Sequence, residues 1–245
     1  MTDPYDVEID AERRTAETEV LREFVTEQRL ERMESVLDDR SRHLVPVVED
    51  LYQPHNASAV LRSADAFGAQ DVHIIENRNR YHVNPGVELG TAKWLSLYRY
   101  RDPRFHLGDP APTDPGRGTE EAIAALRRRG YRIVATTPHR DDVDLDRFPL
   151  DRGAAAIFFG AEKEGLTDLV LDAADEYLRI PMYGFVESLN ISVSAAICLQ
   201  HLGARLRDST VSWRLDPEER SIVLHRWLRR SVKHAASIIR RRLDS

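Results

Sequence analysis

The stretch IPMYGFVESLNISVSAA, from Ile180 to Ala196, joins two apolar elements through a polar segment. Residues 176–181 before it predict a buried strand, and residues 187–207 have the apolar spacing of a long helix. Gly184 lets the main chain approach a neighbour closely. The polar side chains gather where the helix should begin: Glu187, Ser188, Asn190, Ser192 and Ser194. Because open α/β sheets bind ligands in such loops, this joint is a candidate site.

The segments on either side repeat the alternation of strand and helix. Short apolar runs predict strands at 43–51, 71–76, 93–100, 131–136, 154–160 and 176–181. Helical spacing and caps predict helices at 11–40, 56–69, 119–130 with Thr119 as N-cap, 166–175, 187–207 and 216–243, the last as one or two helices. Residues 102–118, rich in Pro and Gly, predict a loop. This order predicts an α/β fold: a mostly parallel sheet with helices on both faces, plus terminal helices.

Composition and charge narrow the class of protein. Of the 245 residues, 42% are hydrophobic and 31% charged, and no apolar run approaches the ~18 residues of a membrane span. The acidic start MTDPYDVEIDAE does not look like a secretory signal, and the single Cys198 excludes an internal disulfide. We therefore expect a cytoplasmic protein with no membrane partner.

The net charge of −6 hides an uneven distribution. Acids outnumber bases in residues 1–40, whereas the chain after residue 220 is basic, with Asp244 as its one acid. A basic tail on an acidic protein favours one local anionic contact, although a solvated helix face would give the same pattern.

Several common signatures of catalysis are missing. GRG at 116–118 lacks the third glycine of a dinucleotide fingerprint and does not follow a strand, and no P-loop GK[ST] occurs. The nine histidines show no HExxH or CxxC-like spacing, which argues against a dedicated metal site. The sequence also lacks a G-x-S-x-G elbow. A Rossmann dehydrogenase and a P-loop NTPase are both disfavoured.

Two further segments that follow strands carry polar residues. YQPHNASAVLR (52–62) places Asn56 and Arg62 on one short helix. Their separation of six residues is about 600° of rotation, so the reach of the arginine would be needed to bring both to one site. FFGAEKEGL (158–166) ends a strand at Gly160 and continues through Glu162. The simpler roles are helix capping for Asn56 and Ser188, a surface charge for Glu162 and a salt bridge for Arg62.

Together, three stretches resemble the motifs of the SPOUT RNA 2′-O-methyltransferases of the TrmH type: PHNASAVLRSADAFGAQDVHII, IFFGAEKEGLTDLVLDAADEYLRIPMYG and ESLNISVSAAICL. The similarity extends over about residues 28–230 and includes RLDPEERSIVLHRWLRR (214–230). Within the family it is nearest to the enzymes that methylate guanosine 18 of tRNA. The resemblance implies a deep trefoil knot in the C-terminal part of the sheet, although knots are otherwise almost absent from proteins. It also implies that the knot forms a pocket for S-adenosylmethionine and that the enzyme is a homodimer.

The resemblance divides the chain into an acidic extension and helix (1–40), an α/β-knot methyltransferase domain (41–208) and a basic helical tail (209–245). By position, it implies a cofactor site of Thr136, Gly160, Ile180 and Leu189. The implied catalytic set is Asn56, Arg62, Glu162, Ser188 and Asn190. The residues expected to hold RNA phosphates are Arg29, Arg32, Arg40, Arg42, Arg226, Arg229, Arg230 and Lys233. The acidic residues 1–27 depart from the family pattern.

The implied reaction transfers a methyl group from S-adenosylmethionine to the ribose 2′-hydroxyl of a tRNA nucleotide. Positioning should supply much of the rate, and no metal is demanded. Arg62 is either the base that takes the hydroxyl proton, helped by Ser188 and a substrate phosphate, or a clamp. The clamp is the alternative because a guanidinium normally stays protonated and would then hold the phosphate and stabilise the alkoxide.

Three other functions compete with this one. A ribosomal RNA ribose methyltransferase shares the motifs but often adds an N-terminal RNA-binding domain, for which residues 1–40 are too short. A non-catalytic knotted RNA-binding protein would be expected to lose some of the five catalytic positions. An unrelated α/β enzyme acting on a small molecule would require the three matching motifs to be accidental.

Overall fold

The computed structural model describes residues 9–79, 90–102, 116–138, 143–161 and 164–244. The chain divides into two compact units. One runs from Arg42 to Trp213, and the other combines the terminal segments, up to Ser41 and from Arg214 onward. We call them the sheet unit and the helical unit. The acidic N-terminal segment and the basic tail, treated as two separate parts in the sequence analysis, therefore form one unit.

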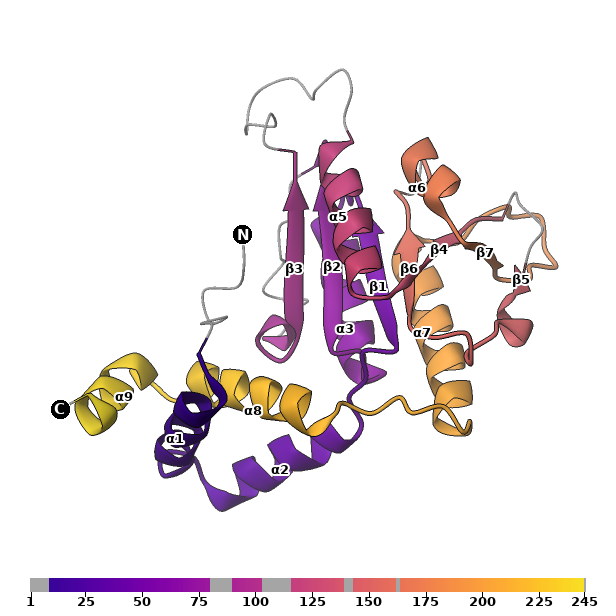
Figure 1. The fold of residues 1–245 in the computed structure, drawn as a ribbon. Helices are drawn as coiled ribbons and strands as arrows, with labels where there is room; N and C mark the ends of the chain where they lie inside the picture. Colours follow the sequence, from indigo (N-terminus) through magenta and orange to yellow (C-terminus); the bar gives the residue numbers. More distant parts are fainter. Residues whose placement is uncertain (1–8, 80–89, 103–115, 139–142, 162–163, 245) are drawn as a thin grey trace. The chain divides into compact units, whose positions relative to one another are not determined.

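The sheet unit contains the predicted parallel sheet. Within the described residues its strands lie in the order β3-β2-β1-β6-β4-β7-β5, and every pairing is parallel (Figure 1). Their bounds are β1 Leu44–Glu49, β2 Asp71–Glu76, β3 Ser96–Arg101, β4 Arg132–Thr136, β5 Val143–Asp144, β6 Ala155–Phe159 and β7 Glu176–Arg179. Six of these strands were predicted. The two-residue β5 was missed because it is too short for an apolar pattern.

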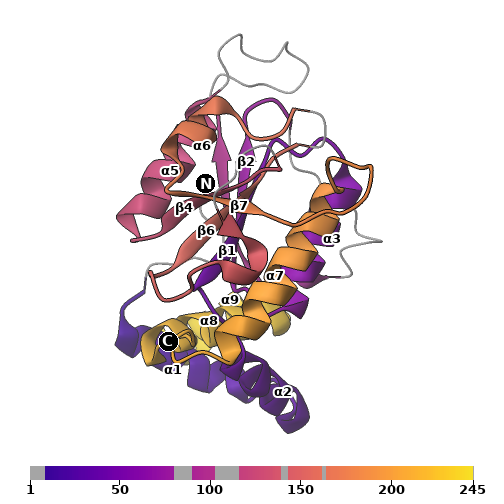
Figure 2. The same ribbon diagram turned by 90° about the vertical axis from the view of Figure 1, so that its right-hand side faces the viewer.

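Helices cover both faces of the sheet, as predicted. The described part of the sheet unit contains four α-helices: α3 Pro54–Ala66, α5 Arg117–Arg128, α6 Asp168–Ala173 and α7 Ile191–Arg207. It also contains two short 3₁₀ helices, η1 Thr91–Lys93 and η2 Leu145–Arg147. α3 and α7 pack side by side over one core, and α5 and α6 cover the other (Figure 2). Strand β6 shows why two cores form: Ile157 and Phe159 enter the first, and Ala156 and Phe158 the second.

Helix starts differ from prediction where a cap decides them. α3 begins at Pro54, two residues earlier than expected, since proline suits the first helical position. α5 begins at Arg117 after Gly116, so the prediction of Thr119 as its N-cap is wrong. α7 begins only at Ile191, because the side chain of Asn190 accepts a 2.9 Å hydrogen bond from the Ser192 N–H. The polar residues Glu187, Ser188 and Asn190 therefore precede the helix and remain available for a site.

The helical unit consists of α1 Ala11–Arg22, α2 Glu27–Asp38, α8 Pro217–Ser231 and α9 Ala235–Leu243. The single helix predicted over 11–40 is two, because Thr26 caps a new helix by accepting from the Arg29 N–H at 3.3 Å. Asp216 and Glu219 form a reciprocal capping box at the start of α8. α1 packs against α8 and α9, so the two ends of the chain share one small core.

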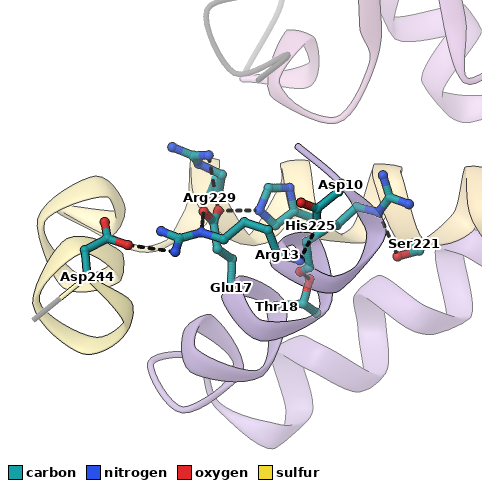
Figure 3. A network of polar contacts seen from close by, with 9 residues as sticks. Asp10, Arg13, Glu17, Thr18, Ser221, His225, Arg229 and Asp244 are labelled. Atoms are coloured by element: carbon teal, nitrogen blue, oxygen red, sulfur yellow. Dashed lines mark hydrogen bonds and ion pairs between the residues drawn. The ribbon is translucent and has the colours of Figure 1, made fainter. Parts of the chain in front are cut away.

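A buried carboxylate fastens α1 to α8 (Figure 3). Glu17 is 4% exposed; its Oε2 accepts from His225 Nε2 at 2.8 Å and from Arg229 Nη1 at 3.3 Å, and its Oε1 accepts from Arg13 Nε at 3.0 Å. Burial opposes ionisation of Glu17, but the hydrogen bonds from His225 and Arg13 outweigh it and lower its pKa. Burial lowers the pKa of His225. The pair is thus an ionised carboxylate with a neutral imidazole.

Two sequence expectations are not settled by strand pairing. Most of the predicted 102–118 loop lies outside the described residues, and the knot stays a prediction. Among the described residues, no helix combines the length and apolarity needed to cross a membrane.

Candidate functional site

A cavity of about 410 Å³ opens at the carboxyl ends of β4, β6 and β7. Its walls come from the loops that follow these three strands and from the segment before α7. The structure places all four residues of the implied cofactor site in this one wall: Thr136, Gly160, Ile180 and Leu189. Positions spread over more than fifty residues of sequence therefore meet around one space. Their role as cofactor ligands stays a prediction.

The loop after β6 is folded back on itself at the cavity. Ala161 and Gly165 form an isolated bridge, in which the Gly165 N–H donates to the Ala161 carbonyl at 2.8 Å. A Cβ atom at Gly160 would lie 2.2 Å from the carbonyl carbon of Gly165, so only glycine fits there. The close approach that we assigned to Gly184 is wrong, because a Cβ at Gly184 meets nothing within 4 Å.

The cavity lining has an apolar part and a polar part. Leu171, Leu178 and Ile191 line it with apolar side chains, while Glu187, Ser188 and Ser194 supply a carboxylate and hydroxyls. S-adenosylmethionine combines a flat adenine with a ribose and a charged methionine end. The donor set and the glycine cradle at Gly160 therefore fit this group.

Two of the implied catalytic residues join the starts of α3 and α7. Asn56, 8% exposed, accepts a 3.2 Å hydrogen bond at its Oδ1 from Asn190 Nδ2. The Oδ1 of Asn190 also accepts from the Ser192 hydroxyl at 2.6 Å. Gln53 holds the N-cap position of α3 and Asn190 that of α7, so the capping roles considered for Asn56 and Ser188 are wrong. Ser188 lies in the cavity wall instead.

Ser188 is the one member of the implied catalytic set, among the described residues, that lines the cavity. Arg62 lies on α3 with an exposed side chain, outside the wall of the cavity. It is on another face of the helix from the buried Asn56, because about 600° of rotation separates the two. Within one chain, the structure therefore does not bring Arg62 into this cavity. Glu162 lies outside the described residues.

The residues expected to bind RNA fall into two groups. Some are occupied inside the protein, which corrects their assignment to a surface. Arg40 is 2% exposed and stacks over the Trp227 ring at 5.4 Å, and Arg226 is 5% exposed. Arg42 bonds through Nε to the buried Asp71 at 3.1 Å. Arg229 bonds to Glu17.

The other cations of the set reach the surface. Arg29, Arg32 and Lys233 are exposed, and Arg230 is half-buried, with burial lowering its pKa to about 10. The C-terminal helix α9 adds exposed cations that our RNA-binding set left out: Arg240, Arg241 and Arg242. Their clustering at the C-terminus was the signal that could have included them. Counting charges in the sequence could not separate these cations from the buried ones.

Sequence reasoning also missed residues that shape the cavity. Met182 and Leu166 line it, and their apolar character gave no functional signal. Glu187 and Ser194 line it too, and both were part of the polar stretch that opened the sequence analysis. Among the described residues, no group of three or more His, Cys, Asp and Glu side chains could hold a metal ion.

Comparisons with known proteins agree with this geometry. Residues 114–200 match the SpoU rRNA Methylase family. The chain is 39% identical over 215 residues to a tRNA (guanosine(18)-2′-O)-methyltransferase of Borreliella burgdorferi, covering 88% of this chain and 91% of that protein. It is 32% identical over 157 residues to a 23S rRNA (guanosine-2′-O-)-methyltransferase of Ralstonia nicotianae, covering 64% of this chain and 56% of that protein.

A solved structure extends the likeness to three dimensions. The TrmH/SpoU tRNA modifying enzyme of A. aeolicus superposes with a TM-score of 0.68 at 26% identity, over 84% of this chain and 98% of that one. An accidental match of the three motifs is thereby excluded, and with it the unrelated small-molecule enzyme. The chain belongs to the SpoU methylase family, in its TrmH group.

Proposed function

We propose that this protein transfers the methyl group of S-adenosylmethionine to the ribose 2′-hydroxyl of guanosine 18 in tRNA. One observation carries the proposal: the cavity at the ends of β4, β6 and β7 adjoins the joint that contains Ser188 and the bonded pair Asn56–Asn190. The proposal also rests on a relative that carries this activity in its name and aligns over 91% of its length.

The cavity supplies what the cofactor needs from the protein. S-adenosylmethionine, when bound, provides a methyl group activated by a sulfonium. The apolar side chains of Leu178 and Ile191 can pack on an adenine, and the glycine cradle at Gly160 leaves backbone groups accessible. Glu187 offers a carboxylate to the cationic end. Rigid attachment of these groups to the sheet favours a fixed orientation.

The substrate side of the site must handle one proton. As the 2′-oxygen bonds to the methyl carbon, the carbon–sulfur bond breaks with its electron pair left on sulfur, and the hydroxyl proton passes to solvent water. Ser188 is placed in the cavity wall, where its hydroxyl can hydrogen-bond the 2′-oxygen. We assign Arg62 to the RNA phosphate and to the developing negative charge, a role open to an exposed guanidinium.

The share of each relative's length that aligns with this chain favours tRNA over ribosomal RNA as the substrate. The chain aligns with 91% of the tRNA enzyme of B. burgdorferi but with only 56% of the 23S rRNA enzyme of R. nicotianae. The exposed cations of the helical unit then provide the phosphate contacts, a role that we assign to Arg29, Arg32, Lys233 and the α9 arginines.

We also propose that the protein works as a homodimer. Large apolar side chains are exposed at the joint that carries the site, and we call them the apolar patch: Tyr52 (80% exposed), Tyr183 (97%), Phe185 (108%), Val186 (62%) and Val193 (44%). Large apolar side chains exposed near one another mark interaction sites in soluble proteins. The patch lies on the segments before α3 and around the start of α7, so a second copy would cover the edge of the cavity.

A chemical deletion in the RNA tests the function. Purified protein is incubated with labelled S-adenosylmethionine and either an unmodified tRNA or the same tRNA with 2′-deoxyguanosine at position 18. Label should enter the first and not the second. Equal labelling of both, or labelling of ribosomal RNA fragments alone, would contradict the proposal.

A further inference from the structure

We propose that Glu49 is a positioning residue: it holds one wall of the cavity, formed by residues 160–161 and 164–167 of the loop after β6, in the shape that receives S-adenosylmethionine. The inference rests on the proposed function, since it assigns that ligand to the cavity. No motif that led to the function includes Glu49, which lies at the end of β1 and is absent from the cavity wall.

Glu49 receives three hydrogen bonds in the interior. Its carboxylate belongs to a residue that is 1% exposed. Oε1 accepts from the hydroxyls of Thr119 at 2.6 Å and Thr167 at 2.9 Å, and Oε2 accepts from the Thr167 N–H at 2.9 Å. Within the described residues these donors are two hydroxyls and a backbone N–H, with no cation among them. A buried carboxylate with neutral donors depends on these hydrogen bonds, because each one offsets part of the cost of burying the group.

Thr167 connects the carboxylate of Glu49 to the wall of the cavity. It occupies the N-cap position of α6, but its side chain makes no capping hydrogen bond. Both its hydroxyl and its N–H turn to Glu49 instead. The two preceding residues, Gly165 and Leu166, line the cavity, and Gly165 lies against Gly160. Glu49 therefore fixes the exit of the loop, as the bridge between Ala161 and Gly165 fixes its turn.

The same carboxylate is anchored on its other side to parts of the fold away from the cavity. Thr119 lies in the first turn of α5 and is fully buried. Its hydroxyl oxygen accepts from Asn77 Nδ2 at 2.8 Å, and the Asn77 N–H donates to Asp50 Oδ1 at 2.7 Å. This chain of bonds ties Glu49 to the end of β2 and the start of α5. One oxygen atom of Glu49 thus joins a rigid anchor, Thr119, to the cavity loop, Thr167.

The shared oxygen provides a matched pair of variants. Thr119→Val and Thr167→Val each replace one hydroxyl that donates to Oε1 of Glu49 with a methyl group of similar size. Thr119→Val also takes the acceptor away from Asn77 Nδ2, so the two variants are compared by ligand binding and by exchange in the loop, not by stability. If the carboxylate serves folding alone, the two changes should act alike on these two readouts. If it positions the loop, Thr167→Val should weaken the ligand and Thr119→Val should not. Thr167→Ser keeps the hydroxyl and serves as the conservative control.

Three readouts on the full-length protein separate these outcomes. Calorimetry gives the Kd for S-adenosylmethionine, thermal melting gives the stability, and hydrogen exchange gives the protection of the Gly165 amide, which is bonded to Ala161. We expect Thr167→Val to raise the Kd about tenfold and to speed exchange at Gly165, because one hydrogen bond to the buried carboxyl group of Glu49 is lost. Thr119→Val should lower the melting temperature at least as much as Thr167→Val does. It should change the Kd less than about twofold. Thr167→Ser should match the wild type.

Equal effects of the two valine variants on the Kd and on exchange would overturn the inference, as would a Thr167→Val protein with wild-type Kd and exchange. A wild-type protein that fails to bind S-adenosylmethionine would refute the proposed function instead. In that case the exchange data still decide whether Glu49 holds the loop.

Discussion

At the scale of single residues, the cavity depends on close backbone contact more than on any charged group. Gly160 and Gly165 pass so near each other that no side chain fits at Gly160. The sequence contains both of these glycines and also Gly184. Sequence alone does not show which of the three packs closely against another backbone segment. That distinction is made by the fold, through the bridge between Ala161 and Gly165.

The first prediction replaces Gly160 with alanine. The new Cβ would lie within 2.4 Å of three backbone atoms of Gly165 and Leu166, none of which can move without shifting the loop. We expect Gly160→Ala to cost about 1–3 kcal/mol of stability and to weaken S-adenosylmethionine binding at least about tenfold. Calorimetry and chemical denaturation measure both. Gly184→Ala is the matched control, because its Cβ meets nothing. Unchanged binding in Gly160→Ala would contradict the cradle.

The second prediction concerns Arg62, which is exposed and lies outside the cavity wall. If its planar fork clamps a phosphate and stabilises the alkoxide, lysine cannot replace it. We expect Arg62→Lys to lower the single-turnover rate about a hundredfold, with no change in the Kd for S-adenosylmethionine. Turnover near that of the wild type would rule out both the clamp and the base.

At the scale of elements, the terminal helices are held by charges that the sequence suggested were free to meet RNA. Arg229 was expected on the surface, yet it bonds to Glu17 (Figure 3). His225, also on α8, bonds to the same carboxylate and so helps to hold α8 against α1. Sequence periodicity located most elements, because burial on one or two faces leaves a regular apolar pattern. It could not show that α1 and α8 face each other, since their contact joins residues about two hundred positions apart.

The third prediction compares two glutamates of α1, the buried Glu17 within the helix and the exposed Glu23 at its C-cap. Glu17→Gln removes a buried charge that binds His225 and Arg229, whose side chains are 6% and 14% exposed. We expect a loss of about 3 kcal/mol in the free energy of unfolding. Glu23→Gln breaks an exposed pair with Arg242, whose side chains are 56% and 54% exposed, and should cost less than about 1 kcal/mol. Equal losses in urea denaturation would contradict a buried network.

The same network predicts a loss of stability in acid. The pKa of Glu17 is lowered on folding, so its contribution is complete above about pH 4.5 and is lost as pH falls through the folded value. The pKa of His225 is lowered as well, so protonation below about pH 6.5 also favours unfolding. Urea denaturation should show the wild type losing stability from pH 7 to pH 3. Below about pH 4.5, Glu17→Gln should lose less than the wild type, because it lacks the carboxylate that takes up the proton. A pH-independent difference between the two proteins would contradict the assignment.

At the scale of the whole molecule, the site adjoins surface that a single chain leaves open. Phe185 is the most exposed side chain of the apolar patch. We expect Phe185→Asp to shift the protein from dimer to monomer in sedimentation, because a buried unpaired charge opposes association. Phe24→Asp, at an exposed apolar residue of the helical unit, should leave the dimer intact. Wild-type protein that sediments as a monomer at micromolar concentration would contradict the dimer.

The family could be identified from the sequence, because the three motifs place the residue types that the cavity needs at fixed positions in the fold. Thr136, Gly160, Ile180 and Leu189 could be named without coordinates and meet in one wall. Glu49 and Thr167 could not, since a glutamate at a strand end and a threonine before a helix are ordinary in sequence. Their meaning lies in a 2.9 Å contact between residues 118 positions apart.

Mapping the methyl group on the RNA tests the proposed function most directly. Unmodified tRNA is treated with the purified protein and S-adenosylmethionine, digested, and sequenced by mass spectrometry. We expect one new 2′-O-methylated nucleotide, guanosine 18, with the added mass on the ribose. A methyl group on a base nitrogen, or on the ribose of another nucleotide with guanosine 18 untouched, would contradict it.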